Sequence, residues 1–260
     1  MKWGVRRFQN KDGSLIPKGK ARYSSDAKEI NLKQKGVSIN SDGSMSISKG
    51  TNIQRLSRRQ STSLGSLTYA SVIEYDNAKY IKYIGGKGIF GGGRDTILLL
   101  QAKEDLKAPS VTDASRIMVN LLKSDSKFRN GIADVFTGAH INNDDFKKMV
   151  DDPTGDTAKA WYTILNSSLI ATSATNPSAS YIKEVFSEAL QKNGYNLLRD
   201  ENDFEGGVSK APLIVLNPEK TLSVVNVADI TDELRNASKE TLREYKNLGK
   251  DWCDKYVYDR

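Results

Sequence analysis

Regular alternation of apolar and polar residues begins at about position 37 and marks out several short strands. Segments 37–40 and 44–48 alternate on either side of Ser41-Asp42-Gly43, which is a strong signal for a β-hairpin. Segments 52–57 and 67–71 are predicted as two further strands, and a polar loop separates them. Residues 95–102 instead contain the uninterrupted apolar run Ile97-Leu98-Leu99-Leu100, which is typical of a strand buried on both faces. The pattern therefore predicts a β-hairpin followed by three strands between residues 37 and 102.

Helical periodicity replaces this alternation between positions 112 and 193. Apolar residues recur three and four positions apart, as in Ile182, Val185, Phe186 and Leu190, which indicates amphipathic helices. Helices are predicted over 112–122, 142–150, 157–172 and 178–193, and a shorter one over 76–83. We therefore expect a helical insertion at 112–193 that packs on the sheet.

Strand patterns return after position 194, at 195–199, 211–216 and 222–227, and a charged helix is expected over 231–246. The resulting fold class is α+β. The predicted organisation is a basic extended arm at 1–36, a body at 37–230 that includes the insertion, and a C-terminal helix with an aromatic tail at 231–260.

The positive charge is concentrated at the N-terminus. Residues 1–60 contain 14 Lys/Arg and 4 Asp/Glu, a net charge of +10, so of the 39 basic and 32 acidic residues, 25 and 28 remain for the other 200, a net −3. Such an arm suits nucleic acid or an acidic protein surface; the alternative is a solvated leader. Its aromatic and basic residues are candidate partner contacts: Trp3, Arg6, Arg7 and Phe8.

Composition removes several kinds of chemistry. A single cysteine, Cys253, excludes an internal disulfide, and with one histidine, His140, no metal site is expected. No apolar run reaches the roughly 18 residues of a membrane span, so no membrane partner is expected. The glycine-rich segment 85–93 lacks the order of a phosphate-binding loop, and a turn or flap is favoured over a phosphate site.

The first 25 residues, MKWGVRRFQNKDGSLIPKGKARYSS, resemble a module found in many phage and prophage proteins. The resemblance rests on the Trp-Gly-Val-Arg-Arg sequence near the start and the Arg-Tyr near the end. It implies a phage-encoded protein, often head-associated, with other phage structural proteins as partners. The expected location is the virion or the host bacterial cytoplasm.

The order of elements in the body is similar to the ADP-ribosyltransferase fold, with its small sheets. That resemblance implies NAD as a cofactor. Arg55 on the first strand of the pair would hold the NAD diphosphate, since a guanidinium binds phosphate oxygens in pairs. Ser71, at the end of the second strand, would support the nicotinamide pocket, with Tyr69 as a stacking face. A buried structural role for Arg55, paired with a carboxylate, is the alternative.

The catalytic glutamate of that family has no clear counterpart. Its expected position, at the start of the strand that leads into Asn217-Pro218, falls at or near Pro212. Glu205 and Glu201 are the nearest substitutes. The sequence therefore favours a virion-associated protein with a catalytically degenerate body. The alternatives are an active NAD-dependent ADP-ribosyltransferase acting on a host macromolecule and a nucleic-acid binder working through residues 1–60.

Overall fold

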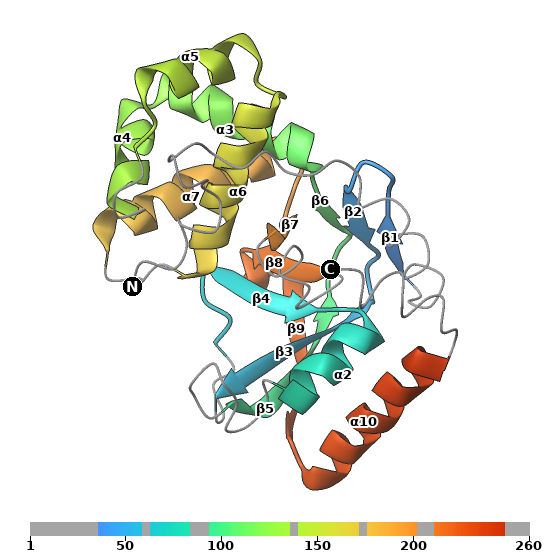
Figure 1. Ribbon diagram of the computed structural model, residues 1–260. Coiled ribbons are helices and arrows are strands. Elements are labelled where there is room, and N and C mark those ends of the chain that lie inside the picture. Colours follow the sequence, from blue (N-terminus) through green and yellow to red (C-terminus); the bar gives the residue numbers. More distant parts are fainter. Residues whose placement is uncertain are drawn as a thin grey trace.

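The computed structural model describes residues 36–58, 63–83, 94–135, 140–171, 176–201 and 211–247. The predicted partner contacts of the arm, the glycine-rich segment, Glu205 and the aromatic tail all lie outside these residues. Within them, helices combine with antiparallel sheets, so the protein is of the α+β class (Figure 1).

The centre of the structure is a six-stranded sheet in the order β7-β8-β4-β3-β5-β9, with every neighbouring pair antiparallel. Its strands are β3 (Asn52–Arg58), β4 (Leu67–Ser71), β5 (Arg94–Ala102), β7 (Leu197–Arg199), β8 (Pro212–Leu216) and β9 (Leu222–Asp229). Each strand expected for these segments is present.

A smaller sheet covers one face of the large one. It contains the predicted hairpin, β1 (Val37–Ile39) and β2 (Met45–Ile47), and a third strand, β6 (Leu106–Ala108). The segment that contains β6 was predicted only as the break after residue 102. Apolar side chains of both sheets form one buried cluster, so this face of the large sheet is sealed by a second layer of strands.

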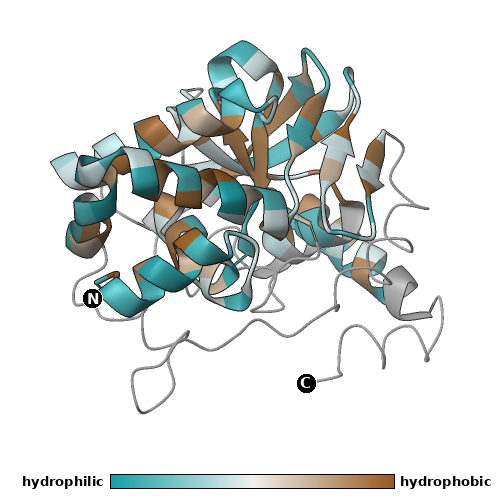
Figure 2. Cartoon of the chain, turned by 90° about the horizontal axis from the view of Figure 1, so that it is seen from above, coloured by the Kyte–Doolittle hydropathy of each residue, from teal (hydrophilic) through white to brown (hydrophobic). Residues whose placement is uncertain are grey.

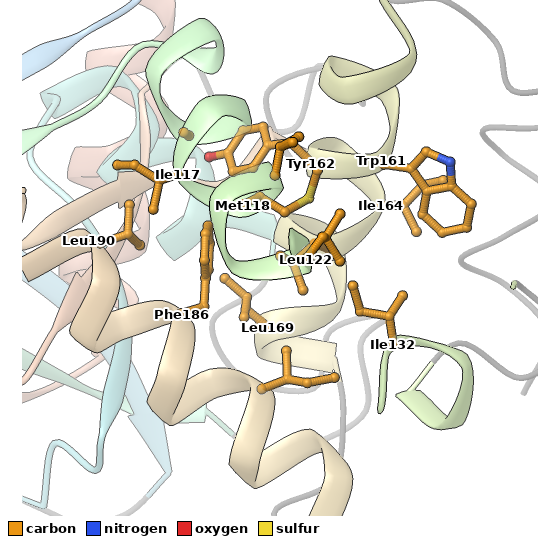
Figure 3. Packing of buried hydrophobic residues seen from close by; sticks show 14 of the residues in the cluster. Ile117, Met118, Leu122, Ile132, Trp161, Tyr162, Ile164, Leu169, Phe186 and Leu190 are labelled. Carbon is orange, nitrogen blue, oxygen red and sulfur yellow. The ribbon is translucent and has the colours of Figure 1, made fainter. Parts of the chain in front are cut away.

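Helices cover the opposite face in two groups. The first group packs over the β7-β8-β4 half of the sheet and comprises α3 (Val111–Ser124), α4 (Ser126–Val135), α5 (Asn143–Asp151), α6 (Asp156–Ala171) and α7 (Pro177–Lys192). Their shared core is large and apolar, with Phe186 and Tyr162 at its centre (Figure 3). The apolar strands lie between polar outer surfaces in the view from above (Figure 2).

The second helical group covers the β3-β5-β9 half. It pairs α2 (Glu74–Tyr83) with α10 (Asp232–Asn247), which lie side by side in Figure 1. Ile81 and Ile230 pack there against Ile97 of β5. A single turn, α9 (Pro218–Thr221), joins β8 to β9. The two groups leave a seam between them above β3 and β4.

Side-chain alternation assigns each strand residue to one of two faces. We call the face covered by α2–α7 and α10 the helical face, and the face covered by β1, β2 and β6 the strand face. Leu56, Ile97 and Ile214 belong to clusters on the helical face, whereas Ile53 and Leu98 belong to the strand-face cluster. This assignment decides which residues can meet a ligand.

Asp125 joins two helices of the first group, and its replacement is expected to be costly. Its carboxylate accepts a hydrogen bond from the Phe128 backbone N–H at 2.8 Å, which caps α4, and one from the Tyr181 hydroxyl of α7 at 2.7 Å. We expect Asp125→Ala to lower the free energy of unfolding by about 1–2 kcal/mol at pH 7. Urea titration measures this loss, with exposed Asp151→Ala as the control.

The same contacts give a pH dependence. The Phe128 N–H first, and then Tyr181, hold the pKa of Asp125 below its ordinary 3.8. A lowered pKa contributes stability above the ordinary value, and that contribution disappears as pH falls through the folded value. The difference between wild type and Asp125→Ala should therefore shrink below about pH 4. An equal effect of Asp125→Ala and Asp151→Ala at pH 7 would contradict the assignment.

Candidate functional site

A cavity of about 520 Å³ lies at the seam between the two helical groups. Strands β3 and β4 form its floor, α2 contributes from one side, and α6 and α7 contribute from the other. Its lining residues are Gln54, Arg55, Leu56, Ser57, Ser66, Leu67, Tyr69, Ala70, Ser71, Asn77, Tyr80, Leu169 and Lys183. The structure thus places Arg55, Tyr69 and Ser71 around the same cavity.

The floor of the cavity opens because β3 and β4 barely pair. They share one register position, Gln54 opposite Ser71, although β3 pairs along its length with β5 and β4 along its length with β8. The two strands therefore separate beyond this position while remaining anchored on their outer sides. The result is a local gap in an otherwise continuous sheet.

Ser71 presents an unsatisfied group at this gap. The residue is 2% exposed, and its hydroxyl oxygen has no hydrogen-bond partner in the part of the chain that the structure describes. Burying a hydroxyl without a partner costs about 1–3 kcal/mol, so such a group indicates a position where a ligand or solvent supplies the missing bond. Ser71 is therefore a candidate contact for a polar molecule in the cavity.

Arg55 lines the cavity, although its register position belongs to the strand face. Its register partner Leu98 is on the strand face, whereas Gln54 and Ser71 share the helical face. The guanidinium donates to the Ser63 carbonyl at 3.0 Å and to the Thr68 hydroxyl at 3.3 Å. Alternation therefore assigns Arg55 and Ser71 to opposite faces of the sheet, yet both residues line the cavity, at the point where β3 and β4 separate. That the guanidinium holds a diphosphate there stays a prediction.

Two tyrosines form an aromatic corner of the cavity. Tyr69 of β4 and Tyr80 of α2 meet edge to face, with ring centroids 5.8 Å apart and an interplanar angle of 90°, and their hydroxyls are in contact. Such a corner offers a flat surface and a polar end to an aromatic ligand. Tyr69 was a candidate from the resemblance. Tyr80 was predicted only as part of the buried side of a short helix.

Lys183 is a lining residue that sequence reasoning missed. It lies on α7, about 110 residues after β4, and reaches the cavity only because the helical group packs on the sheet. Partial burial lowers the pKa of its ammonium group. A bound anion would act in the opposite direction, because a nearby negative charge stabilises the charged form of a lysine. No local pattern could have distinguished it from other helix-surface lysines.

Of the two glutamates proposed for catalysis, the structure describes Glu201 alone. Glu201 is buried in an ion pair with Arg199, with 3.1 Å between Arg199 Nη2 and Glu201 Oε1, and it is not a lining residue. Glu205 lies outside the described residues. Pro212 occupies the position opposite Ser71 on β8, where the resemblance would place a carboxylate. None of the described lining residues is an aspartate or a glutamate.

Other features of the described chain give no competing site. Among these residues, no group of three or more His, Cys, Asp or Glu side chains could hold a metal ion. His140 is exposed just before α5. No helix in the described ranges is both long and apolar enough to cross a membrane. No family model, curated protein or solved structure matches the chain.

Proposed function

We propose that this protein is a phage-encoded, virion-associated protein whose ADP-ribosyltransferase-like body binds an NAD-type nucleotide without transferring ADP-ribose. The observation that carries the binding proposal is the cavity at the seam, where an unsatisfied serine, an aromatic corner and a lysine converge. Its volume falls within the about 300–1,000 Å³ typical of small-molecule sites. The phage origin rests on the resemblance of the first 25 residues.

The lining matches the chemistry of a nucleotide. The Tyr69–Tyr80 corner suits a planar heteroaromatic ring, and the Lys183 ammonium suits a phosphate. The absence of acidic side chains among the described lining residues removes a source of repulsion for an anion. These features favour a nucleotide over a neutral or cationic ligand.

The same lining argues against transfer chemistry. Cleaving the nicotinamide–ribose bond develops positive charge on the sugar, and a carboxylate normally stabilises it. The described lining supplies none, and Pro212 stands at the matching strand position. Incubation with labelled NAD and bacterial lysate tests this directly. We expect neither protein labelling nor NAD hydrolysis above background, and turnover by the purified protein would establish the active-transferase alternative.

The virion proposal has a separate test. Mass spectrometry of purified phage particles should detect peptides of this chain at a level comparable to known minor virion proteins. Consistent absence from particles, with the protein present in infected-cell lysate, would overturn the virion assignment and leave the binding proposal standing.

Lys183 provides a quantitative prediction for nucleotide binding. Replacing it with methionine keeps the packing of its stem but removes the charge next to the phosphate, so NAD should bind about tenfold more weakly, a loss of about 1.4 kcal/mol. Isothermal titration calorimetry measures the affinity. Lys192→Met, on the same helix but outside the cavity lining, is the control and should bind like wild type.

The pH dependence of this binding has a defined sign. Burial lowers the pKa of Lys183, so its positive charge is present below that value and lost above it. Wild-type affinity should therefore weaken as pH rises through the alkaline range, and the Lys183→Met variant should lack this change. Equal NAD affinity of Lys183→Met and wild type at neutral pH would contradict the role of Lys183.

A further inference from the structure

We propose that Gln54 and Ser71 together form hydrogen bonds with the polar edge of the bound ring. They would thereby select a ligand that presents a hydrogen-bond donor and an acceptor side by side. This inference rests on the proposed nucleotide binding. It adds which part of the ligand is recognised, the polar edge of a ring, and which residue recognises it, Gln54. The resemblance assigned the polar contact on β3 to Arg55, one position further along the strand.

The register of the sheet brings the two residues together. Gln54 and Ser71 are directly opposed at the one position that β3 and β4 share, so their side chains emerge on the same face with Cβ atoms about 4.5–5.5 Å apart. Both residues line the cavity. Tyr69 lies two residues before Ser71 and therefore on that same face. The pair sits beside the aromatic corner at the point where the strands separate.

The chemistry of the pair defines the ligand. The glutamine side chain offers one carbonyl acceptor and an NH₂ donor in a plane, and it therefore matches a group with the complementary order. The Ser71 hydroxyl either donates or accepts, and it has no partner among the described residues. A ring held against Tyr69 and Tyr80 would present its edge to these groups. A ligand whose edge has the complementary donor and acceptor should bind about tenfold or more tightly than one whose edge does not.

Two parts of an NAD-type nucleotide carry such an edge. One is the carboxamide on the nicotinamide ring. The other is the 6-amino group of adenine with its neighbouring ring nitrogen, and a glutamine side chain can form two hydrogen bonds to that edge at once, as it does in protein–DNA complexes. The shared chemistry is an adjacent donor and acceptor on a planar ring. Mononucleotides that carry only one of the two rings distinguish these sources.

Calorimetry with four mononucleotides tests the inference. AMP is compared with IMP, in which the 6-amino donor becomes an oxygen acceptor, and nicotinamide mononucleotide is compared with its nicotinic acid analogue. We expect wild type to prefer the amino or amide member of at least one pair about tenfold. In Gln54→Met that preference should fall to within about twofold, because methionine has a similar shape but neither donor nor strong acceptor. Gln101→Met, on β5 outside the cavity lining, should keep the wild-type preference.

Ser71→Ala adds a readout that a purely structural hydroxyl would not give. Because the hydroxyl is buried without a described partner, its removal should leave the melting temperature of the ligand-free protein unchanged or slightly higher. The affinity for the preferred mononucleotide should nevertheless fall about tenfold. A lowered melting temperature with unchanged affinity would mean that Ser71 serves the fold and would overturn its role in the pair.

The outcomes separate this inference from the proposed function. If nucleotides bind without a preference within either pair, or if the preference persists in Gln54→Met, then Gln54 does not recognise the edge of the ring. The proposed binding site would remain in either case. Failure of NAD and all four mononucleotides to bind overturns the proposed function and, with it, this inference. A preference only within the AMP pair assigns the edge to adenine, and one only within the nicotinamide pair assigns it to the carboxamide.

Discussion

Replacing Glu201 with alanine should lower the free energy of unfolding by about 3–5 kcal/mol, because it leaves the Arg199 guanidinium charged and buried without this carboxylate. The Arg199 and Glu201 side chains are only 5% and 3% exposed, and Arg199 Nε also donates to Glu201 at 3.2 Å. Asn166 fixes the same segment, since it accepts from the Glu201 backbone N–H at 2.8 Å and donates to the Arg199 carbonyl at 2.8 Å. The glutamate closes a buried polar network.

Chemical denaturation measures this loss, and two variants provide comparison. Glu240→Ala breaks an exposed pair with Arg243 at 3.0 Å and should cost less than about 1 kcal/mol. Replacing both Arg199 and Glu201 with leucine should recover part of the loss, because an apolar pair leaves no unpaired charge. A Glu201→Ala protein as stable as wild type would contradict this structural role, and NAD hydrolysis by wild type that the stable variant lacks would restore Glu201 as a catalytic candidate.

Phe186→Ala should cost about 3–5 kcal/mol, since it removes a large ring from the centre of the helical core. Phe186 is fully buried, and its ring centroid lies 6.4 Å from that of Phe128 and 6.3 Å from that of Tyr162. Figure 3 shows Phe186 and Tyr162 within this cluster. Helices α4, α6 and α7 therefore all meet at this side chain. The resulting cavity could not be closed without moving three helices.

The matched control is Val185→Ala, the neighbouring and only partly buried residue on α7. It should cost less than half as much in urea titration, because fewer atoms lose their packing. Because Lys183 lies on the same helix, nucleotide affinity should fall in Phe186→Ala even at temperatures where the protein stays folded. A loss of stability no larger than that of Val185→Ala would contradict the central position of the ring.

Much of the fold could be predicted because local signals agreed with long-range packing. The first hairpin combined strict alternation with an Asp-Gly turn, in which Gly43 adopts a φ of +83° that favours glycine. Helix α4 was missed because Gly131 weakens its intrinsic helix signal. In the structure, a Cβ at Gly131 would come within 3.3 Å of Ile182 Cδ1 of α7, so this glycine lies where the two helices approach closely and a larger residue would displace the Ile182 side chain.

The site was less predictable, since its composition depends on register and on distant packing. The resemblance in the order of elements drew attention to Arg55, but one position along a strand reverses the face to which a residue belongs, and the residue opposite Ser71 is Gln54. Lys183 enters from a helix whose position over the sheet no local pattern specifies. The three-residue β6 was missed for a similar reason, because its pairing with β2 is long-range.

The most direct measurement is a crystal structure of the protein grown with NAD. Density for the intact dinucleotide should lie between α2 and α7, with a ring against Tyr69 and a hydrogen bond to Ser71 Oγ. A cavity that stays filled only with solvent at saturating NAD, or a nucleotide bound elsewhere on the chain, would contradict a nucleotide site at the helical seam.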